Sequence, residues 1–259
     1  DSLNGIPTSI KDLALTKGIR TTFGSKIYEN FIPTEDTVYV SRLKDAGIVL
    51  LGKTNTPEFG FKGVTDNYLF GTTKNPWDLT RTSGGSSGGA ASAVAAGMSP
   101  LAQGSDGGGS IRIPACFCGL YGLKPSFGRV PVYPSVYFMG HTLSHIGPIV
   151  RYVKDAALML DAMKGSHHGD RYSLPADPIN YFDKIEETPK KLKIGFSMNL
   201  GYAKVVDEEV KEAVLNSVKK FEQLNWTVEE IKMKLRKPEL CFYTLWTSML
   251  AYDLKPKLN

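Results

Sequence analysis

The sequence predicts an α/β fold, because helices and strands are expected to alternate along the chain. Residues 36–46 carry apolar side chains at roughly helical spacing among charges, and a glycine follows them. Residues 48–52 then open as a continuous apolar run, which is typical of a buried strand. Nearer the C-terminus, residues 192–196, 207–224 and 226–231 show the same alternation of strand, helix and strand.

The other elements follow from the same rules. Residues 6–13 are predicted to form a short strand with a proline near its start. Residues 53–85 contain several prolines and glycines, so we expect a long loop-rich region. The segment 88–97 is rich in alanine, the best helix former, and a glycine ends it. A strand is expected at 100–104, and the spacing of apolar residues predicts an amphipathic helix over 153–163.

Composition places the chain among globular proteins. Of its 259 residues, 42% are hydrophobic and 22% are charged, which argues against disorder. The net charge of +5 is dispersed and does not by itself favour nucleic-acid binding. No linker divides the chain, so we expect a single domain over 1–259. The chain opens in an apparent loop at Asp1 and ends without a helix cap, so we expect it to be truncated at both ends.

Three cysteines give no disulfide framework, which suits a reducing compartment. Cys116 and Cys118 lack the spacing of a zinc site, so we expect two small apolar fillers and no metal. The sequence shows no apolar run of about 18 residues and no signal peptide. These features predict a cytoplasmic protein that needs no cofactor and does not enter a membrane.

Two glycine–serine clusters, TSGGSSGG at 82–89 and GSDGGGS at 104–110, are the most unusual feature. Gly/Ser linkers stay polar, whereas each of these clusters runs into an apolar segment. A phosphate-binding P-loop requires a lysine after its last glycine, and neither cluster has one. The residues before Gly84, DLTRTS, read as a poor strand, so the dinucleotide-binding pattern is also disfavoured.

A nucleophile elbow is a further alternative, because Gly84, Ser86 and Gly88 match G-x-S-x-G. The elbow requires an apolar strand just upstream, which the sequence does not show. It also requires a histidine base. His141 and His145 stand downstream in HTLSHIGP, a segment that equally suits a packed loop. A Ser–His–Asp enzyme stays open but is not favoured.

The second cluster places three glycines directly before a serine: Gly107, Gly108, Gly109 and then Ser110. Without Cβ atoms, consecutive backbone N–H groups can converge beside the serine hydroxyl. Such a group of donors forms an oxyanion hole, which stabilises the negative charge that develops on a carbonyl oxygen under attack.

A nucleophilic serine requires a base, and Lys11, near the end of the predicted strand 6–13, is the candidate. A lysine with its ordinary pKa of about 10.4 is protonated at neutral pH and cannot accept a proton. Burial can lower this pKa to about 7–8. Ser86 or Ser87 is available to relay the proton.

These residues resemble the amidase signature hydrolases. The resemblance rests on five blocks in family order: GIPTSIKD, TNTPEFG, LFGTTKNPWD, GGSSGGAASAVAAGMSPLAQGSD and GGSIRIPACFCGLYGLKPSFGRVP. They lie within residues 1–148, and weaker similarity continues to about residue 163. The resemblance implies a mixed β-sheet core covered by helices on both faces.

The resemblance also implies a Ser–cis-Ser–Lys triad. By motif, Ser110 is the nucleophile, Ser86 is the bridging serine of a cis peptide, and Lys11 is the base. The remaining expected roles are an oxyanion hole made by the amides of residues 107–110, support of the loop or site by Ser87, Asp106 and Arg112, and an acyl pocket lined by Gly60 and Phe61.

The implied activity is cleavage of a small-molecule carboxylic amide to an acid and ammonia or an amine through an acyl-enzyme, in an enzyme that acts alone or as a homodimer. The alternative is the glutaminase component of a tRNA-dependent amidotransferase, its A subunit, which works in a complex. That subfamily usually reads SIRQP, whereas Ile113 gives SIRIP here, which favours the stand-alone enzyme. A scaffold that has lost activity is a third, weaker alternative, since all three triad positions are present.

Overall fold

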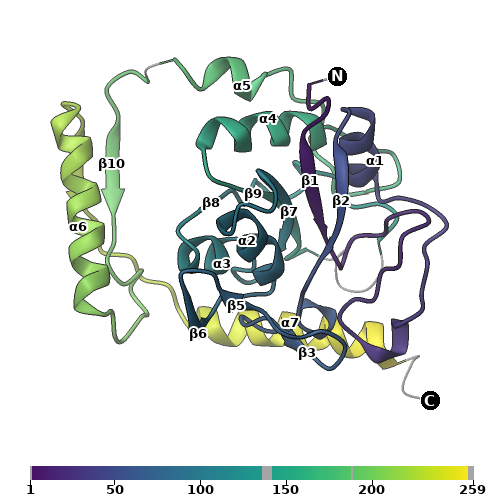
Figure 1. The fold of residues 1–259 in the computed structure, drawn as a ribbon. Helices are drawn as coiled ribbons and strands as arrows, with labels where there is room; N and C mark the ends of the chain where they lie inside the picture. Colours follow the sequence, from purple (N-terminus) through teal and green to yellow (C-terminus); the bar gives the residue numbers. More distant parts are fainter. Residues whose placement is uncertain (1, 136–141, 188, 256–259) are drawn as a thin grey trace. The chain divides into compact units, whose positions relative to one another are not determined.

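The computed structural model describes residues 2–135, 142–187 and 189–255. Its contacts divide the chain into two compact units, Asp1–Ile185 and Glu186–Asn259 (Figure 1). This division does not test whether both units belong to one folding domain, so the single domain over 1–259 stays a prediction. Within the described ranges, no helix has both the length and the apolar character required to cross a membrane.

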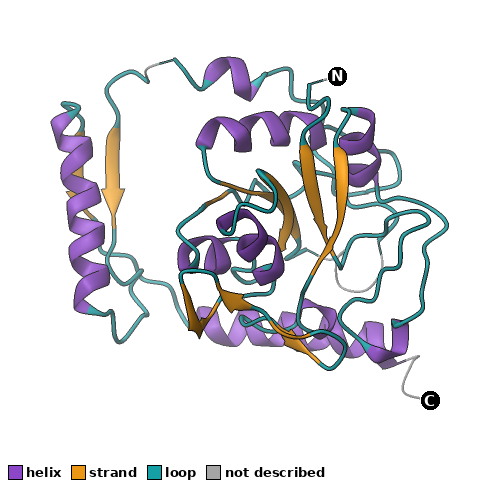
Figure 2. Ribbon diagram, viewed as in Figure 1, coloured by secondary structure: helices purple, strands orange, loops and turns teal. Residues whose placement is uncertain are grey.

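The first unit is built on a five-stranded sheet (Figure 2). The strand order is β2 (Val49–Thr54), β1 (Pro7–Lys11), β7 (Leu101–Asp106), β9 (His145–Val150) and β8 (Tyr121–Gly122). Strand β1 runs parallel to both β2 and β7, whereas β9 is antiparallel to β7 and β8. The predicted mixed sheet is therefore confirmed.

The register of β1 and β7 joins two segments about ninety residues apart in the sequence. Ser9 pairs with Ala102, and Ile10 pairs with Gln103. The Lys11 N–H donates to Gln103 Oε1 at 3.1 Å, which extends the contact to the end of β1. The last residue of β1 is thereby held beside the end of β7, from which the second glycine–serine cluster continues.

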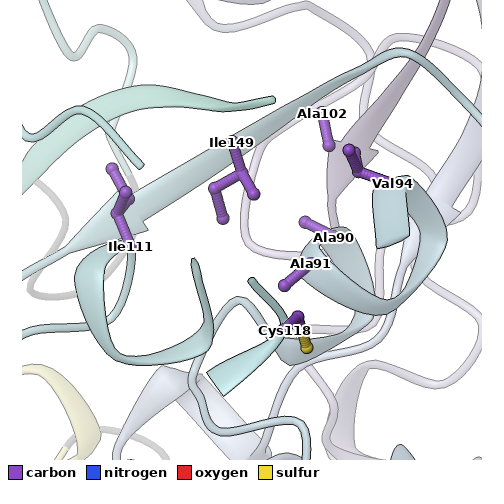
Figure 3. Packing of buried hydrophobic residues seen from close by; sticks show 7 residues of the cluster. All are labelled: Ala90, Ala91, Val94, Ala102, Ile111, Cys118 and Ile149. Carbon is purple, nitrogen blue, oxygen red and sulfur yellow. The ribbon is translucent and has the colours of Figure 1, made fainter. Parts of the chain in front are cut away.

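Helices cover both faces of the central strands. On one face, Ala90, Ala91 and Val94 of α2 (Gly88–Ala95) form a buried cluster with Ala102 of β7 and Ile149 of β9, and Ile111 and Cys118 complete it (Figure 3). Leu101 and Val150, which the alternation of a strand directs to the opposite face, are also buried. On that face α4 (Val153–Met163) packs against β9 and β8, and α1 (Val38–Asp45) packs against α4.

The glycines of α2 explain how closely this helix approaches the sheet. A Cβ atom on Gly89 would lie 2.3 Å from the backbone nitrogen of Asn55. Real Cβ atoms do not come this close to backbone, so position 89 accepts only glycine without movement of the chain. The small-residue helix predicted from the sequence is therefore required by packing.

The segment between β2 and α2 contains more regular structure than the sequence indicates. The added elements are η2 (Glu58–Gly60) and two short hairpins, β3 (Asp66–Asn67) with β4 (Gly71–Thr72) and β5 (Lys74–Asn75) with β6 (Asp78–Thr82). DLTRT, which reads as a poor strand, forms β6, so that expectation is wrong. In the part of the chain that the structure describes, β6 pairs with β5 alone in a two-stranded hairpin, and such a strand does not require an apolar sequence.

The prediction of a buried strand after α1 is also wrong in part. Strand β2 forms as expected, but Val49 and Leu51 are 49% and 53% exposed. Within the described residues β2 is an edge strand of the sheet. An apolar run predicts the strand from its side chains, whereas burial depends on what packs against it.

The second unit contains a strand–helix–strand segment and a final helix. Strands β10 (Lys193–Phe196) and β11 (Thr227–Glu230) pair in parallel, and α6 (Glu208–Gln223) connects them. Asp207 caps α6 by accepting a hydrogen bond from the N–H of Glu209. Helix α7 (Pro238–Leu254) was not predicted, because its apolar residues are spread around the whole helix and give no periodic signal.

Most predicted elements are confirmed to within a few residues: the strands at 6–13, 100–104, 192–196 and 226–231, and the helices at 36–46, 88–97, 153–163 and 207–224. Missed elements include η1 (Lys26–Tyr28), α3 (Arg112–Phe117), α5 (Tyr181–Lys184), β8 and β9.

Candidate active site

Lys11 is the last residue of β1 and has no exposed surface. Its Nζ atom lies within hydrogen-bond distance of three hydroxyl oxygens: 2.7 Å from Ser86, 2.8 Å from Ser87 and 3.0 Å from Ser105. Burial lowers the pKa of Lys11 from 10.5 to about 7, and the negative charge of Asp106 opposes that shift. A substantial fraction of Lys11 is therefore neutral at pH 7 and able to accept a proton.

Ser86 and Ser87 lie in the loop between β6 and α2, and the peptide bond between Gly85 and Ser86 is cis. A Cβ on Gly85 would lie 2.7 Å from the carbonyl oxygen of Val64. A Cβ on Gly88 would lie about 2.5 Å from the hydroxyl oxygens of Thr65 and Ser83. The glycines of TSGGSSGG are therefore explained by backbone and side-chain atoms that crowd the loop around the two serines.

Ser110 lies between β7 and α3 and is 8% exposed. The Ser87 N–H donates to the Ser110 carbonyl at 3.2 Å, so the two glycine–serine clusters meet through their backbones. Among the described residues, no hydrogen bond is recorded between the Ser86 and Ser110 hydroxyls. The structure thus joins Lys11 to Ser86 directly and holds the loop of Ser110 against the loop of Ser86 and Ser87.

Asp106 ends β7 and organises the loop that carries Ser110. Its carboxylate accepts hydrogen bonds from the N–H groups of Gly109 (2.7 Å) and Ile111 (3.2 Å). The Arg112 guanidinium donates to both carboxylate oxygens, at 2.9 and 3.0 Å. Burial alone would raise the pKa of Asp106, but these donors and the charge of Arg112 hold it below its usual value. Asp106 and Arg112 thus bind each other, and Asp106 binds the loop that carries Ser110.

The loop leaves a restricted set of amides for an oxyanion. The Gly109 N–H is directed to Asp106, so it is already used. No hydrogen bond is recorded in the described structure for the N–H groups of Gly107, Gly108 and Ser110. Gly107 is half-buried and Gly108 is exposed. Gly109 is needed for another reason, since a Cβ there would lie 2.8 Å from the side chain of Ile113.

Ser105 was missed by the sequence analysis. Its hydroxyl is a third partner of Lys11 Nζ, and its backbone N–H donates to Ser87 Oγ at 3.3 Å. The expected strand 100–104 stopped one residue short of it. One feature of the sequence could have identified it. If the expected strand is continued through Ser105 and placed beside the strand of Lys11, both side chains come to the same end of the sheet.

The two residues expected to line an acyl pocket lie in and after η2. Gly60 is buried, and Phe61 is 43% exposed. The chain then passes Gly63, where a Cβ would touch the Ile113 side chain at 3.7 Å, and reaches Val64 against Gly85. The segment therefore lies along the serine loops. A separate cavity of about 450 Å³ lies between α4, α5 and residues 121–129, and none of Lys11, Ser86 and Ser110 lines it.

The histidine alternative gains no support where the structure describes it. His145 Nδ1 lies 3.0 Å from the carbonyl oxygen of Asp106 and 2.9 Å from that of Leu143, so backbone oxygens hold the ring. His141 lies outside the described residues. No group of three or more His, Cys, Asp or Glu side chains suited to a metal is found in the described part of the chain, where all three cysteines are free.

Comparison with known proteins gives a consistent result. The family model described as Amidase matches residues 1–255. The A subunit of glutamyl-tRNA(Gln) amidotransferase from Sulfurihydrogenibium sp. (strain YO3AOP1) is 44% identical over 235 residues, which is 91% of this chain and 48% of that protein. Acylamidase of Rhodococcus erythropolis is 44% identical over 257 residues, 97% of this chain and 53% of that protein. The chain thus spans about half the length of these relatives.

Solved structures agree on the fold. A 6-aminohexanoate cyclic dimer hydrolase complexed with substrate superimposes with a TM-score of 0.92 at 34% identity, covering 98% of this chain and 54% of that one. A bacterial aryl acylamidase of the amidase signature family gives a TM-score of 0.89 at 36% identity, covering 96% and 52%. The A subunit of glutamyl-tRNA(Gln) amidotransferase from Thermotoga maritima gives 0.85 at 35% identity, covering 99% and 56%.

Proposed function

The chain belongs to the amidase family, and we propose that the protein hydrolyses a carboxylic amide through an acyl-enzyme on Ser110. The observation that carries this proposal is the environment of Lys11. Its amine is fully buried, lies 2.7 Å from the hydroxyl of Ser86, and has a pKa of about 7. A lysine in that state serves as a general base near neutral pH.

In the proposed mechanism the lone pair of neutral Lys11 accepts the proton of Ser86, and Ser86 accepts the proton of Ser110. The Ser110 oxygen attacks the amide carbonyl carbon and forms a tetrahedral adduct. When the C–N bond breaks, the proton returns from Lys11 through Ser86 to the leaving nitrogen, which departs as ammonia or an amine. Water, deprotonated along the same path, then attacks the ester, and the acid leaves as Ser110 regains its proton.

The negative charge of the tetrahedral adduct requires donors that are already in place. The N–H groups of Gly107, Gly108 and Ser110 are the ones that the loop leaves available, and Gly109 acts through Asp106 to fix the loop. Loss of one such donor typically slows an acyl transfer by about 10²–10³-fold. We include Gly60 and Phe61 as a wall of the acyl pocket because their segment runs along Gly85 and Ile113.

The test is covalent labelling with a fluorophosphonate, followed by peptide mapping by mass spectrometry. Wild type is expected to carry a single adduct on Ser110, and Lys11→Ala is expected to lose it or to form it far more slowly. An adduct on Ser86 with Ser110 unmodified would reverse the two roles and favour the nucleophile elbow. No adduct on the whole protein would refute a serine hydrolase.

A second candidate is the glutaminase component of a tRNA-dependent amidotransferase, and the names of several relatives favour it. Against it stands Ile113, whose apolar side chain packs beside Gly109 and Gly84, where that subfamily usually carries glutamine. Hydrolysis of glutamine that appears only when partner proteins are added would select this candidate. Hydrolysis of simple amides by the isolated protein would select the stand-alone amidase. We extend the proposal to a cytoplasmic enzyme whose direct partner is a small-molecule amide, and a homodimer stays a prediction.

A further inference from the structure

Lys53 of β2 is a second buried lysine, and its side chain is only 10% exposed. The Nζ atom lies within hydrogen-bond distance of the Ala14 carbonyl at 2.5 Å, the Thr16 hydroxyl at 3.0 Å and the Thr21 hydroxyl at 2.8 Å. These three oxygens all belong to the loop that leaves β1 directly after Lys11. Lys53 therefore joins the first residues of this loop to its far side.

The same ammonium group faces Asp12, the residue that follows Lys11. Lys53 Nζ lies 3.7 Å from Asp12 Oδ1, and no hydrogen bond to this oxygen is recorded among the described residues. The other oxygen accepts hydrogen bonds from the backbone N–H and the hydroxyl of Thr22, at 3.1 and 2.5 Å. The Asp12 carboxylate thus lies between the Lys53 ammonium group and Thr22, at the far end of the loop.

Backbone contacts connect this arrangement to the base. In the register of β1 and β2, Ile10 pairs with Lys53 and Lys11 pairs with Thr54. The Asp12 N–H donates to the Thr54 carbonyl at 3.0 Å. Because side chains alternate along a strand, Lys53 and Asp12 lie on the face opposite to Lys11. Lys53 therefore does not touch the catalytic hydroxyls, and the paired backbones of β1 and β2 connect it to Lys11.

We propose that Lys53 is a positioning residue for the reaction: by holding Asp12 and the loop 14–21, it fixes the end of β1 and so the position of Lys11 Nζ against Ser86. This inference rests on the proposed function. A buried ion pair is weak support for stability, since well-packed apolar side chains of similar volume often stabilise a protein as much. The proposed base must hold its amine 2.7 Å from a hydroxyl, and the ion pair lies one strand away. The ion pair is therefore better explained by a role in positioning this base than by a role in stability.

The charge on Lys53 is compatible with this role at the pH where Lys11 acts. Burial lowers the pKa of Lys53 to about 8, against the opposing charge of Asp12. Two more distant charges have smaller effects on the pKa of Lys53. The charge of Asp36, itself paired with Lys44 at 2.8 Å, also opposes the lowering, whereas the charge of Lys44 adds to it. Near pH 7, where Lys11 titrates, Lys53 is largely protonated and donates to the loop.

The test compares Lys53→Met with the matched control Lys44→Met in the whole protein. The readout is the rate at which a fluorophosphonate labels Ser110, measured from about pH 5.5 to 9.5. This range of about four pH units covers the pKa shifts that burial produces. Lys53→Met is expected to label about 10–100-fold more slowly, because small displacements of a catalytic group have effects of that size. The pH midpoint is expected to rise by about one unit as water reaches the Lys11 amine. Lys44→Met is expected to match wild type in both.

A role in stability alone would lower the unfolding temperature of Lys53→Met but leave the pH midpoint of the folded protein unchanged, and that result would overturn the proposal. If Lys53→Met does not fold, the same labelling experiment is done with Thr21→Val, which removes a single acceptor of the Lys53 ammonium group. A raised midpoint in Thr21→Val supports the proposal, and an unchanged one overturns it. Wild type that never labels on Ser110 would instead remove the proposed function, and this inference with it.

Discussion

Lys11 is expected to lower the stability of the protein at neutral pH, and replacing it with methionine tests this directly. The folded pKa is about 7, whereas an unfolded lysine keeps its ordinary value of 10.5. Between these values the unfolded chain holds a proton that the folded protein lacks. Stability therefore rises with pH across this window, and the penalty is largest at and below pH 7. Methionine fills most of the same volume and does not titrate.

The size of the effect follows from the shift. Each pKa unit corresponds to about 1.4 kcal/mol, so removal of the lysine relieves roughly 4 kcal/mol at pH 7 and roughly 2 kcal/mol at pH 9. The substitution also removes the three hydrogen bonds to the serine hydroxyls, each a loss of about 1 kcal/mol. Lys11→Met should thus be more stable than wild type by about 1 kcal/mol at pH 7 and less stable by about 1 kcal/mol at pH 9.

Urea unfolding at pH 7, 8 and 9 measures this difference, because all other titrating groups are common to both proteins. The stability of wild type relative to Lys11→Met should increase by about 2 kcal/mol between pH 7 and pH 9. Lys44→Met, which removes a half-exposed lysine, should give a curve nearly parallel to that of wild type. Parallel curves for Lys11→Met and wild type would show that Lys11 titrates with an ordinary pKa, and the proposed base would lose its physical foundation.

Three further predictions follow from the same site. The rate of fluorophosphonate labelling of Ser110 should rise with pH through a midpoint of about 7, since the base acts only when neutral; a flat profile from pH 6 to 8 would contradict this. Gly89→Ala should lose about 1–3 kcal/mol in urea unfolding, because its Cβ would lie 2.3 Å from the backbone of Asn55, and an unchanged midpoint would refute the close approach. Arg112→Met should lose about 1–3 kcal/mol and slow the labelling, because Asp106 loses its two-point partner; equal rates would show that the loop does not need this pair.

The sequence alone predicts those features that depend on local pattern or on an ordered set of motifs. Helix α4 has the predicted bounds because its apolar residues follow a helical period within eleven positions. The positions of Lys11, Ser86 and Ser110 follow from blocks whose order and spacing are specific. Their roles stay proposals, but the structure brings Lys11, at the end of β1, and the loops of the two serines together at one end of the sheet.

The features that could not be predicted depend on contacts across the sheet. Ser105 becomes a partner of Lys11 only because β7 pairs with β1 in a particular register, and no local pattern fixes that register. The exposure of Leu51 depends on what covers an edge strand. The use of the Gly109 amide by Asp106 depends on the path of a loop whose glycines permit many conformations.

The two buried lysines show why the partners of an amine decide its use. Lys53 faces the carboxylate of Asp12, and this negative charge limits the effect of burial, so its pKa falls only to about 8. The Lys11 amine is hydrogen-bonded to three hydroxyls. The Asp106 carboxylate is hydrogen-bonded to Arg112 and to backbone amides, and it acts on Lys11 only through its charge. Hydroxyls can both donate to a neutral amine and accept from a charged one, so they satisfy Lys11 in either state without fixing its charge. A base must change its protonation state during the reaction, whereas a positioning cation must keep it, and the partners of each lysine match the role proposed for it.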